Sequence, residues 1–174
     1  MKKIILASAI AMSLLATGAN AAQNGQITFL GAVTQDTCDL SPEVNGAGVN
    51  QIDLGTVKIG AANGTPVDFK LVKNPDPANT CAGITAGKIA TVSFMGNLTN
   101  QGVENQGGSA TGAYAVLVAK NAQTANSEIK AGKDSVTFDA MKLNTDGFQF
   151  SAELKPGQTA GDFRSVVSYA VAYN

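Results

Sequence analysis

The side chains best able to do chemistry are two cysteines, Cys38 and Cys81, and a scatter of carboxylates. The sequence contains no histidine, which removes the usual base of a catalytic triad and the commonest metal ligand. Aspartates near turns commonly bond to the local backbone, and this is our interpretation of Asp134, Asp139, Asp146 and Asp162. No carboxylate pair stands out as an acid–base couple, and no glycine-rich phosphate loop follows a strand. We therefore expect no catalytic residues, no metal site and no cofactor.

The first 21 residues have the pattern of a signal peptide. A positive start, Met1-Lys2-Lys3, precedes an apolar run from Ile4 to Leu15, and small residues at Ala19 and Ala21 favour cleavage before Ala22. The apolar run is too short for a membrane anchor, which needs about 20 apolar residues. We expect residues 1–21 to be removed during export.

Export sets the charge and the redox state of the mature chain. Of 174 residues, 153 remain, enough for one domain. The loss of Lys2 and Lys3 reduces 12 basic residues to 10, against 13 acidic ones, a net charge of −3. No basic patch suggests a nucleic-acid partner. Because disulfides form in oxidising compartments, we expect Cys38 to pair with Cys81, closing a loop worth about 4 kcal/mol.

The pattern of apolar residues predicts an all-β fold. Nineteen glycines and a charged fraction of only 14% accompany short apolar stretches separated by turn formers. A strand with a bulge at Gly55-Thr56 is expected over Ile52–Ile59, and a glycine- and asparagine-rich stretch, 97–112, is expected to be an exposed loop. The other expected strands carry alternating apolar residues at Val67, Phe69 and Leu71; Ala90, Val92 and Phe94; Tyr114, Val116 and Val118; Val136 and Phe138; and Phe148, Phe150, Ala152 and Leu154.

Two further alternating strands lie near the two ends of the chain. In the first, which begins just after the expected cleavage site, the alternate positions are Gly25, Ile27, Phe29, Gly31 and Val33. In the second, which we expect to run to Asn174, they are Phe163, Val167, Tyr169, Val171 and Tyr173, with the tyrosines as packing residues. If the second strand lacks a neighbour on one side, its apolar edge invites association.

Several motifs, taken in order, resemble the subunits of chaperone–usher fimbriae (pili) of Gram-negative bacteria. They are the amino-terminal alternation with Gly31 before Cys38, the runs Ile52–Val57 and Val67–Leu71 before Cys81, the run Val92–Gly96, Gly161 fourteenth from the carboxy end, and the penultimate Tyr173. The likeness covers the whole mature chain. Length and the glycine-rich middle loop are most similar to major subunits of enterobacterial colonisation fimbriae.

The resemblance implies an immunoglobulin-like sandwich that lacks its final strand and is completed by donor-strand exchange. A periplasmic chaperone would first supply the missing strand, and the next subunit would then replace it, a known form of strand addition. By this resemblance residues 22–34 are the donor extension, residues 35–174 are the pilin domain, and the strand from Phe163 to Tyr173 borders the acceptor groove. Identical subunits and an outer-membrane usher would be further partners, and the chain would pass through the periplasm to the cell surface.

The function implied is that of a structural subunit of an adhesive fimbrium that polymerises head to tail. One alternative is a minor or adaptor fimbrial subunit. Another is a major subunit that itself binds host glycan receptors, for which the polar stretches Gly96–Gly112 and Asn121–Lys133 are the candidate surfaces.

Overall fold

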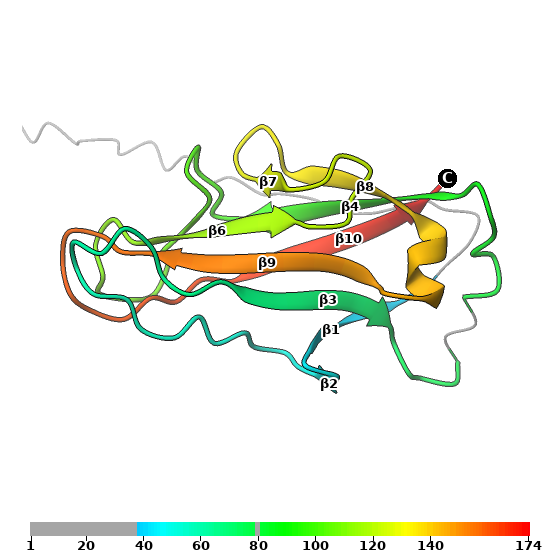
Figure 1. Cartoon of the computed structure of the whole chain (residues 1–174), viewed down its shortest axis with the longest axis horizontal. Coiled ribbons are helices and arrows are strands. Elements are labelled where there is room, and N and C mark those ends of the chain that lie inside the picture. The colour runs from blue at the N-terminus through cyan, green and yellow to red at the C-terminus, as the bar shows by residue number, and fades with distance from the viewer. Residues whose placement is uncertain (1–37, 79–80) are drawn as a thin grey trace, which may run out of the picture.

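Two antiparallel sheets lie face to face in the computed structural model, which describes residues 38–78 and 81–174 (Figure 1). The larger sheet has the order β2-β1-β3-β9-β6-β5, with β7 also paired to β6, and the smaller has the order β10-β4-β8. The strands are β1 (Leu40–Val44), β2 (Ala47–Gly48), β3 (Val67–Lys73), β4 (Ile89–Gly96), β5 (Val103–Glu104), β6 (Tyr114–Ala119), β7 (Ser127–Ile129), β8 (Ser135–Asp139), β9 (Phe148–Lys155) and β10 (Val167–Tyr173), and a 3₁₀ helix, η1, spans Ala140–Asn144. The expected all-β class is confirmed, with the strands arranged in two sheets.

Aromatic side chains from both sheets form the centre of the core. Phe138 on β8 and Phe148 and Phe150 on β9 are completely buried. The Phe138 ring lies 4.4 Å from that of Phe148 and 5.5 Å from that of Phe150, while Phe94 on β4 meets Phe150 edge-on at 5.3 Å. Such pairs add about 0.5–1.5 kcal/mol each beyond the burial of their area, so they hold the two sheets together.

Strands with one apolar and one polar face occur where the alternation predicts them. This holds for β3, β4, β8 and β9. The turn after β3 also forms as expected, because Asn74 Oδ1 accepts a hydrogen bond from the backbone N–H of Asp76 at 3.0 Å, and Asp76 Oδ1 accepts one from that of Ala78 at 2.8 Å. These side-chain bonds replace the ladder and end the strand.

Strand β6 forms, but the face predicted for the core is the wrong one. Its buried residues are Ala115, Leu117 and Ala119, whereas Tyr114, Val116 and Val118 are half-buried. All six residues of β6 are apolar, so their alternation alone cannot tell which face turns inward.

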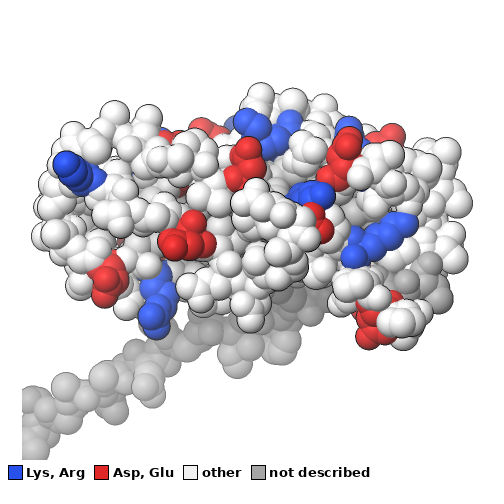
Figure 2. All heavy atoms as spheres, turned by 60° about the horizontal axis from the view of Figure 1, so that its bottom comes forward, with Lys and Arg blue, Asp and Glu red and all other residues white. Residues whose placement is uncertain are grey.

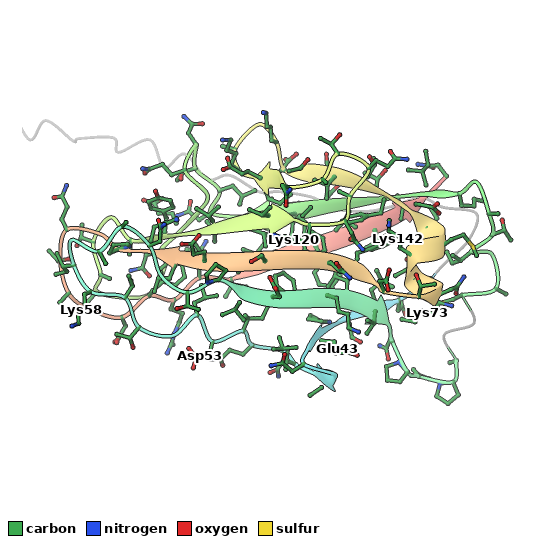
Figure 3. All side chains as sticks on the ribbon, viewed as in Figure 1. Glu43, Asp53, Lys58, Lys73, Lys120 and Lys142 are labelled. Atoms are coloured by element: carbon green, nitrogen blue, oxygen red, sulfur yellow. A yellow bond between two sulfur atoms is a disulfide. The ribbon has the colours of Figure 1, made fainter. Side chains whose placement is uncertain are left out.

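The strand expected over Ile52–Ile59 is absent. Gly55 has φ +70°, a left-handed conformation that interrupts an extended run. Its backbone N–H donates to Asp53 Oδ1 at 2.8 Å, which makes a local turn. The segment between β2 and β3 is irregular, and Asp53 and Lys58 project outward from it (Figure 3).

The loop expected over residues 97–112 is more ordered and more buried than the composition suggests. It contains β5, which pairs with β6 through Val103 and Ala115. Val103 and Ala110 are only 5% and 6% exposed. The expectation of a wholly exposed loop was therefore wrong, because Val103 and Ala110 are buried and β5 joins the larger sheet.

The expected signal peptide and donor strand lie outside the described residues. Within residues 38–78 and 81–174, no helix is long and apolar enough to cross a membrane.

Candidate strand-acceptor edge

Among the described strands, β10 lies at the edge of the smaller sheet. It pairs antiparallel with β4 from Val167 opposite Gly96 to Tyr173 opposite Ala90. Within residues 38–78 and 81–174, β4 is the one strand that pairs with β10. The other side of β10 has no strand partner among these residues, and a sheet edge of this kind is where another strand can add.

The side chains of β10 are covered unevenly. Tyr173 is buried, with 3% of its surface exposed, whereas Val167, Tyr169 and Val171 are half-buried and pack against the core. Phe163, expected on the same strand, is half-buried but lies four residues before β10 begins. The structure thus places four of the five predicted acceptor residues on β10 and corrects the fifth.

Further half-covered apolar side chains border the same core. Leu40 on β1, Leu54 on the irregular segment before β3, and Phe69 on β3 pack against it without being buried. Full burial of an apolar side chain is worth about 1.5–3 kcal/mol. These half-covered side chains would therefore be stabilised by further apolar cover.

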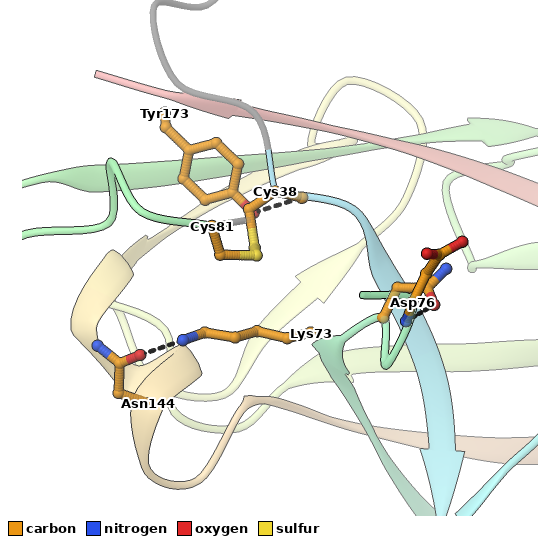
Figure 4. The surroundings of a disulfide bond; sticks show 7 residues. Cys38, Lys73, Asp76, Cys81, Asn144 and Tyr173 are labelled. Atoms are coloured by element: carbon orange, nitrogen blue, oxygen red, sulfur yellow. Dashed lines mark hydrogen bonds between the residues drawn. A yellow bond between two sulfur atoms is a disulfide. The ribbon is translucent and has the colours of Figure 1, made fainter. Parts of the chain in front are cut away.

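Two tyrosine hydroxyls tie β10 to the start of β1. Tyr169 Oη donates to the Leu40 carbonyl oxygen at 2.8 Å, and Tyr173 Oη donates to that of Cys38 at 3.0 Å (Figure 4). Burial is the main cause that raises the pKa of both phenols, and the negative charge of Asp39 adds to it. Both tyrosines are packing residues, as expected, but the hydrogen bonds were not foreseen.

The predicted disulfide is present beside these bonds. Cys38 and Cys81, 43 positions apart, are joined with 4.5 Å between their Cα atoms (Figure 4). Because Tyr173 bonds to the carbonyl of Cys38 itself, the disulfide fixes the backbone against which the end of β10 rests.

Charge is dispersed over the surface. Basic and acidic side chains are interspersed on the face shown in Figure 2, and most of that face is uncharged. Some charges pair across strands: Lys70 on β3 lies opposite Glu43 on β1, with 2.8 Å between Nζ and Oε1. The visible face has no region of one sign that would attract a polyanion.

Of the two polar stretches expected as receptor surfaces, the second borders a hollow. The hollow has a volume of about 620 Å³ and lies between the loop before β7, the β7–β8 turn and β8. Glu128, Lys130, Lys133 and Asp134 are among its lining residues. The first stretch instead packs on the segment that leads into β10, through Asn105, whose role the sequence did not signal.

Comparison with known proteins gives the family. The F107 fimbrial protein of Escherichia coli is 40% identical over 173 residues, which cover 99% of each chain. The K99 fimbrial protein of Escherichia coli is 31% identical over 182 residues, again 99% of each chain. No family model matches the sequence. The chain belongs to the family of these fimbrial proteins.

Two solved pilus structures are among those that this chain is similar to. The P pilus rod subunit PapA is 20% identical, with 87% of this chain and 100% of that chain covered and a TM-score of 0.46. A subunit of a chaperone–usher pilus is 19% identical, with coverage of 87% and 96% and a TM-score of 0.44. The family membership established above makes this chain a structural subunit of a surface fimbrium and not an enzyme.

Proposed function

We propose that this subunit polymerises head to tail by inserting residues 22–34 of one copy along the outer edge of β10 in the next. The observation that carries the proposal is the edge itself: among the described strands β10 has a ladder with β4 alone, and its half-covered side chains Val167, Tyr169 and Val171 pack against the core. An incoming strand would complete the ladder and cover these side chains in one step.

The donor has the composition that such an edge needs. Ile27, Phe29 and Val33 fall on one face of the alternation, and burying each is worth about 1.5–3 kcal/mol. Each backbone hydrogen bond adds about 0.5–1.5 kcal/mol. Gly25 and Gly31 share that face, and glycine leaves room where the strand passes close to a facing backbone.

The geometry of the exchange accounts for a filament. Donor and acceptor are different parts of one chain, so the contact is heterologous and need not close into a ring. Each added copy presents a new donor or a new edge, and growth continues.

An edge of this kind needs protection before assembly, since an unpaired apolar strand pairs with any available partner. We include in the proposal an export signal at residues 1–21, a periplasmic chaperone that occupies β10 in transit, and an outer-membrane usher at which the donor of the next copy replaces it. The pilin domain then spans residues 35–174.

Deletion of residues 22–34 tests the proposal. The shortened chain should be exported and should bind the chaperone but should not join a filament, while a matched variant in which Thr28, on the opposite face of the donor, becomes serine should assemble normally. Electrophoresis of surface-extracted protein with and without boiling gives the readout. A ladder of multiples that survives the deletion would contradict the proposal.

The hollow beside β7 and β8 favours a second candidate function, glycan binding by the shaft itself. Its polar and charged lining, which includes Glu128 and Lys130, can bond to sugar hydroxyls. Filaments made of this subunit alone should then bind host glycolipids, and loss of binding after Lys133→Ala without loss of filaments would support the site. Absence of binding by pure filaments would leave the structural function alone.

A further inference from the structure

Two segments far apart in the sequence meet at the end of the sandwich where β10 begins. We call them the clasp: residues 105–112, which lead from β5 to β6, and residues 157–166, which lead from β9 to β10. In Figure 1 the connection from β9 to β10 lies at the same end of the molecule as the start of β6. The clasp therefore links the edge of the larger sheet to the strand proposed as the acceptor.

Asn105 is the centre of the clasp. Its Nδ2 donates to the carbonyl oxygens of Gly108 and Ala110, both at 2.9 Å, and of Asp162 at 3.2 Å. Its Oδ1 accepts from the backbone N–H groups of Gly108 at 3.0 Å and of Arg164 at 2.9 Å. A single amide that donates and accepts at once is required here, since a carboxylate of the same size has no donor.

Backbone bonds extend the same contact toward β10. The Arg164 carbonyl oxygen accepts from the N–H groups of Gln106 at 2.8 Å and of Gly107 at 3.1 Å. The Gln106 side chain in turn accepts from the N–H of Val166 at 3.1 Å, one residue before β10 begins. Hydrogen bonds thus hold the chain as far as the residue that precedes the proposed acceptor strand.

Three glycines allow the two backbones to touch. A Cβ atom at Gly161 would lie 2.3 Å from Ser109 Oγ and 2.6 Å from Ala110 N. A Cβ at Gly108 would lie 1.8 Å from the carbonyl oxygen of Asp162. A Cβ at Gly157 would lie 2.1 Å from the carbonyl oxygen of Thr111. No side chain fits at these distances. This contact gives a steric reason for the glycine that the sequence places fourteenth from the carboxy end.

From these contacts we infer that Asn105 is a positioning residue for strand addition: through the clasp it holds the first residues of β10 extended and in place for an incoming strand. The inference rests on the proposed function of β10. At its first residues β10 pairs with β4 and with no other described strand. The hydrogen bonds from the hydroxyls of Tyr169 and Tyr173 lie farther along β10. If the clasp is loosened, residues 164–168 become ordered only when the incoming strand binds. This additional ordering slows the uptake of that strand.

The test uses the full mature chain, refolded by dilution from urea with an excess of a labelled synthetic peptide of residues 22–34. Because each residue that must be ordered costs conformational entropy, Asn105→Ala should take up the peptide at least about tenfold more slowly than the unaltered chain. The matched control is Asn97→Ala, an exposed asparagine of the connection between β4 and β5 that donates to Glu104 Oε2; its uptake should be unchanged.

Amide hydrogen exchange separates positioning from general destabilisation. In Asn105→Ala, exchange should become faster at residues 164–168 while β9 and the second half of β10 keep their protection. Unchanged uptake, or a loss of protection that spreads through β9, would overturn the inference. If the unaltered chain takes up no peptide at all, the proposed strand addition itself fails, which is a different result from equal uptake by both chains.

Milder variants keep the test decisive if Asn105→Ala does not fold. Ser109→Ala removes one hydrogen bond of the clasp, from the N–H of Asp162 at 3.2 Å, and should slow uptake in the same direction by a smaller factor. Gly161→Ala opens the clasp by steric clash, with Gly48→Ala as its control because a Cβ at Gly48 meets nothing within 4 Å. Uptake that is the same for Gly161→Ala and Gly48→Ala would overturn the inference.

Discussion

The hydroxyl of Tyr173 donates a hydrogen bond to the carbonyl oxygen of Cys38 across 3.0 Å and 135 sequence positions. One partner is the last residue of β10, and the other is half of the disulfide to Cys81. The end of the proposed acceptor strand is therefore held by a covalently fixed piece of backbone, while its start is held by the clasp around Asn105. Between these two attachments lies the outer edge of β10, the proposed site of strand addition.

Alkaline pH should weaken the fold through Tyr173. Burial and the charge of Asp39 raise the pKa of Tyr173, so unfolding returns the phenol to its ordinary pKa of about 10. The unfolded chain then binds fewer protons than the folded one, and stability falls as the pH rises. This contribution is fully present below pH of about 10 and is lost progressively above it.

Urea denaturation between neutral and strongly alkaline pH measures this effect. Tyr173→Phe should be less stable at neutral pH by about 0.5–1.5 kcal/mol, the worth of one hydrogen bond, and should lose less stability than the unaltered chain on going to alkaline pH. Identical slopes for the two chains would show that Tyr173 is not the group responsible.

Removal of the disulfide should cost about 4 kcal/mol, because the unfolded chain regains the freedom of a long loop. Urea denaturation should compare the free energy of unfolding of the double variant Cys38→Ser, Cys81→Ser with that of the unaltered chain. Reduction of the unaltered chain should reproduce the loss. A cost below about 1 kcal/mol would mean that native contacts, such as that between Tyr173 and Cys38, already hold this region in place.

The two faces of the donor should respond differently to charge. Phe29→Asp places a carboxylate on the face proposed to be buried, where an unpaired charge is strongly unfavourable, and should abolish filament formation. Thr28→Asp places the same charge on the opposite face and should leave most of the assembly intact. The yield of sheared surface filaments compares them, and equal yields would refute the proposed register.

How far the sequence predicts the fold depends on the polarity of each strand. Val67–Leu71 and Phe148–Leu154 alternate with polar residues, so both the strand and its buried face follow from the pattern. Tyr114–Ala119 is apolar throughout, and packing against β9 decides which face is buried. Ile52–Val57 alternates as a strand would, yet the left-handed turn at Gly55 interrupts it.

The sequence also contains a hairpin signal that the predicted strands do not include. Asn45-Gly46 has positive φ angles of 51° and 84° and joins β1 to β2, and this dipeptide is the strongest short-range mark of a hairpin. The clasp has no such signal. Asn105 bonds to Asp162 and Arg164, 57 and 59 positions away, and an asparagine in a polar stretch is otherwise typical of an ordinary turn.

The most direct measurement of strand exchange is a photo-cross-link from position 29. A photoreactive phenylalanine analogue replaces Phe29, and isotope-labelled and unlabelled chains are mixed before assembly, so that cross-links between copies carry both labels. The account predicts mixed-label products that join position 29 to residues 163–173 of another copy. Cross-links confined within single chains, or products that join position 29 to another surface of the sandwich, would contradict it.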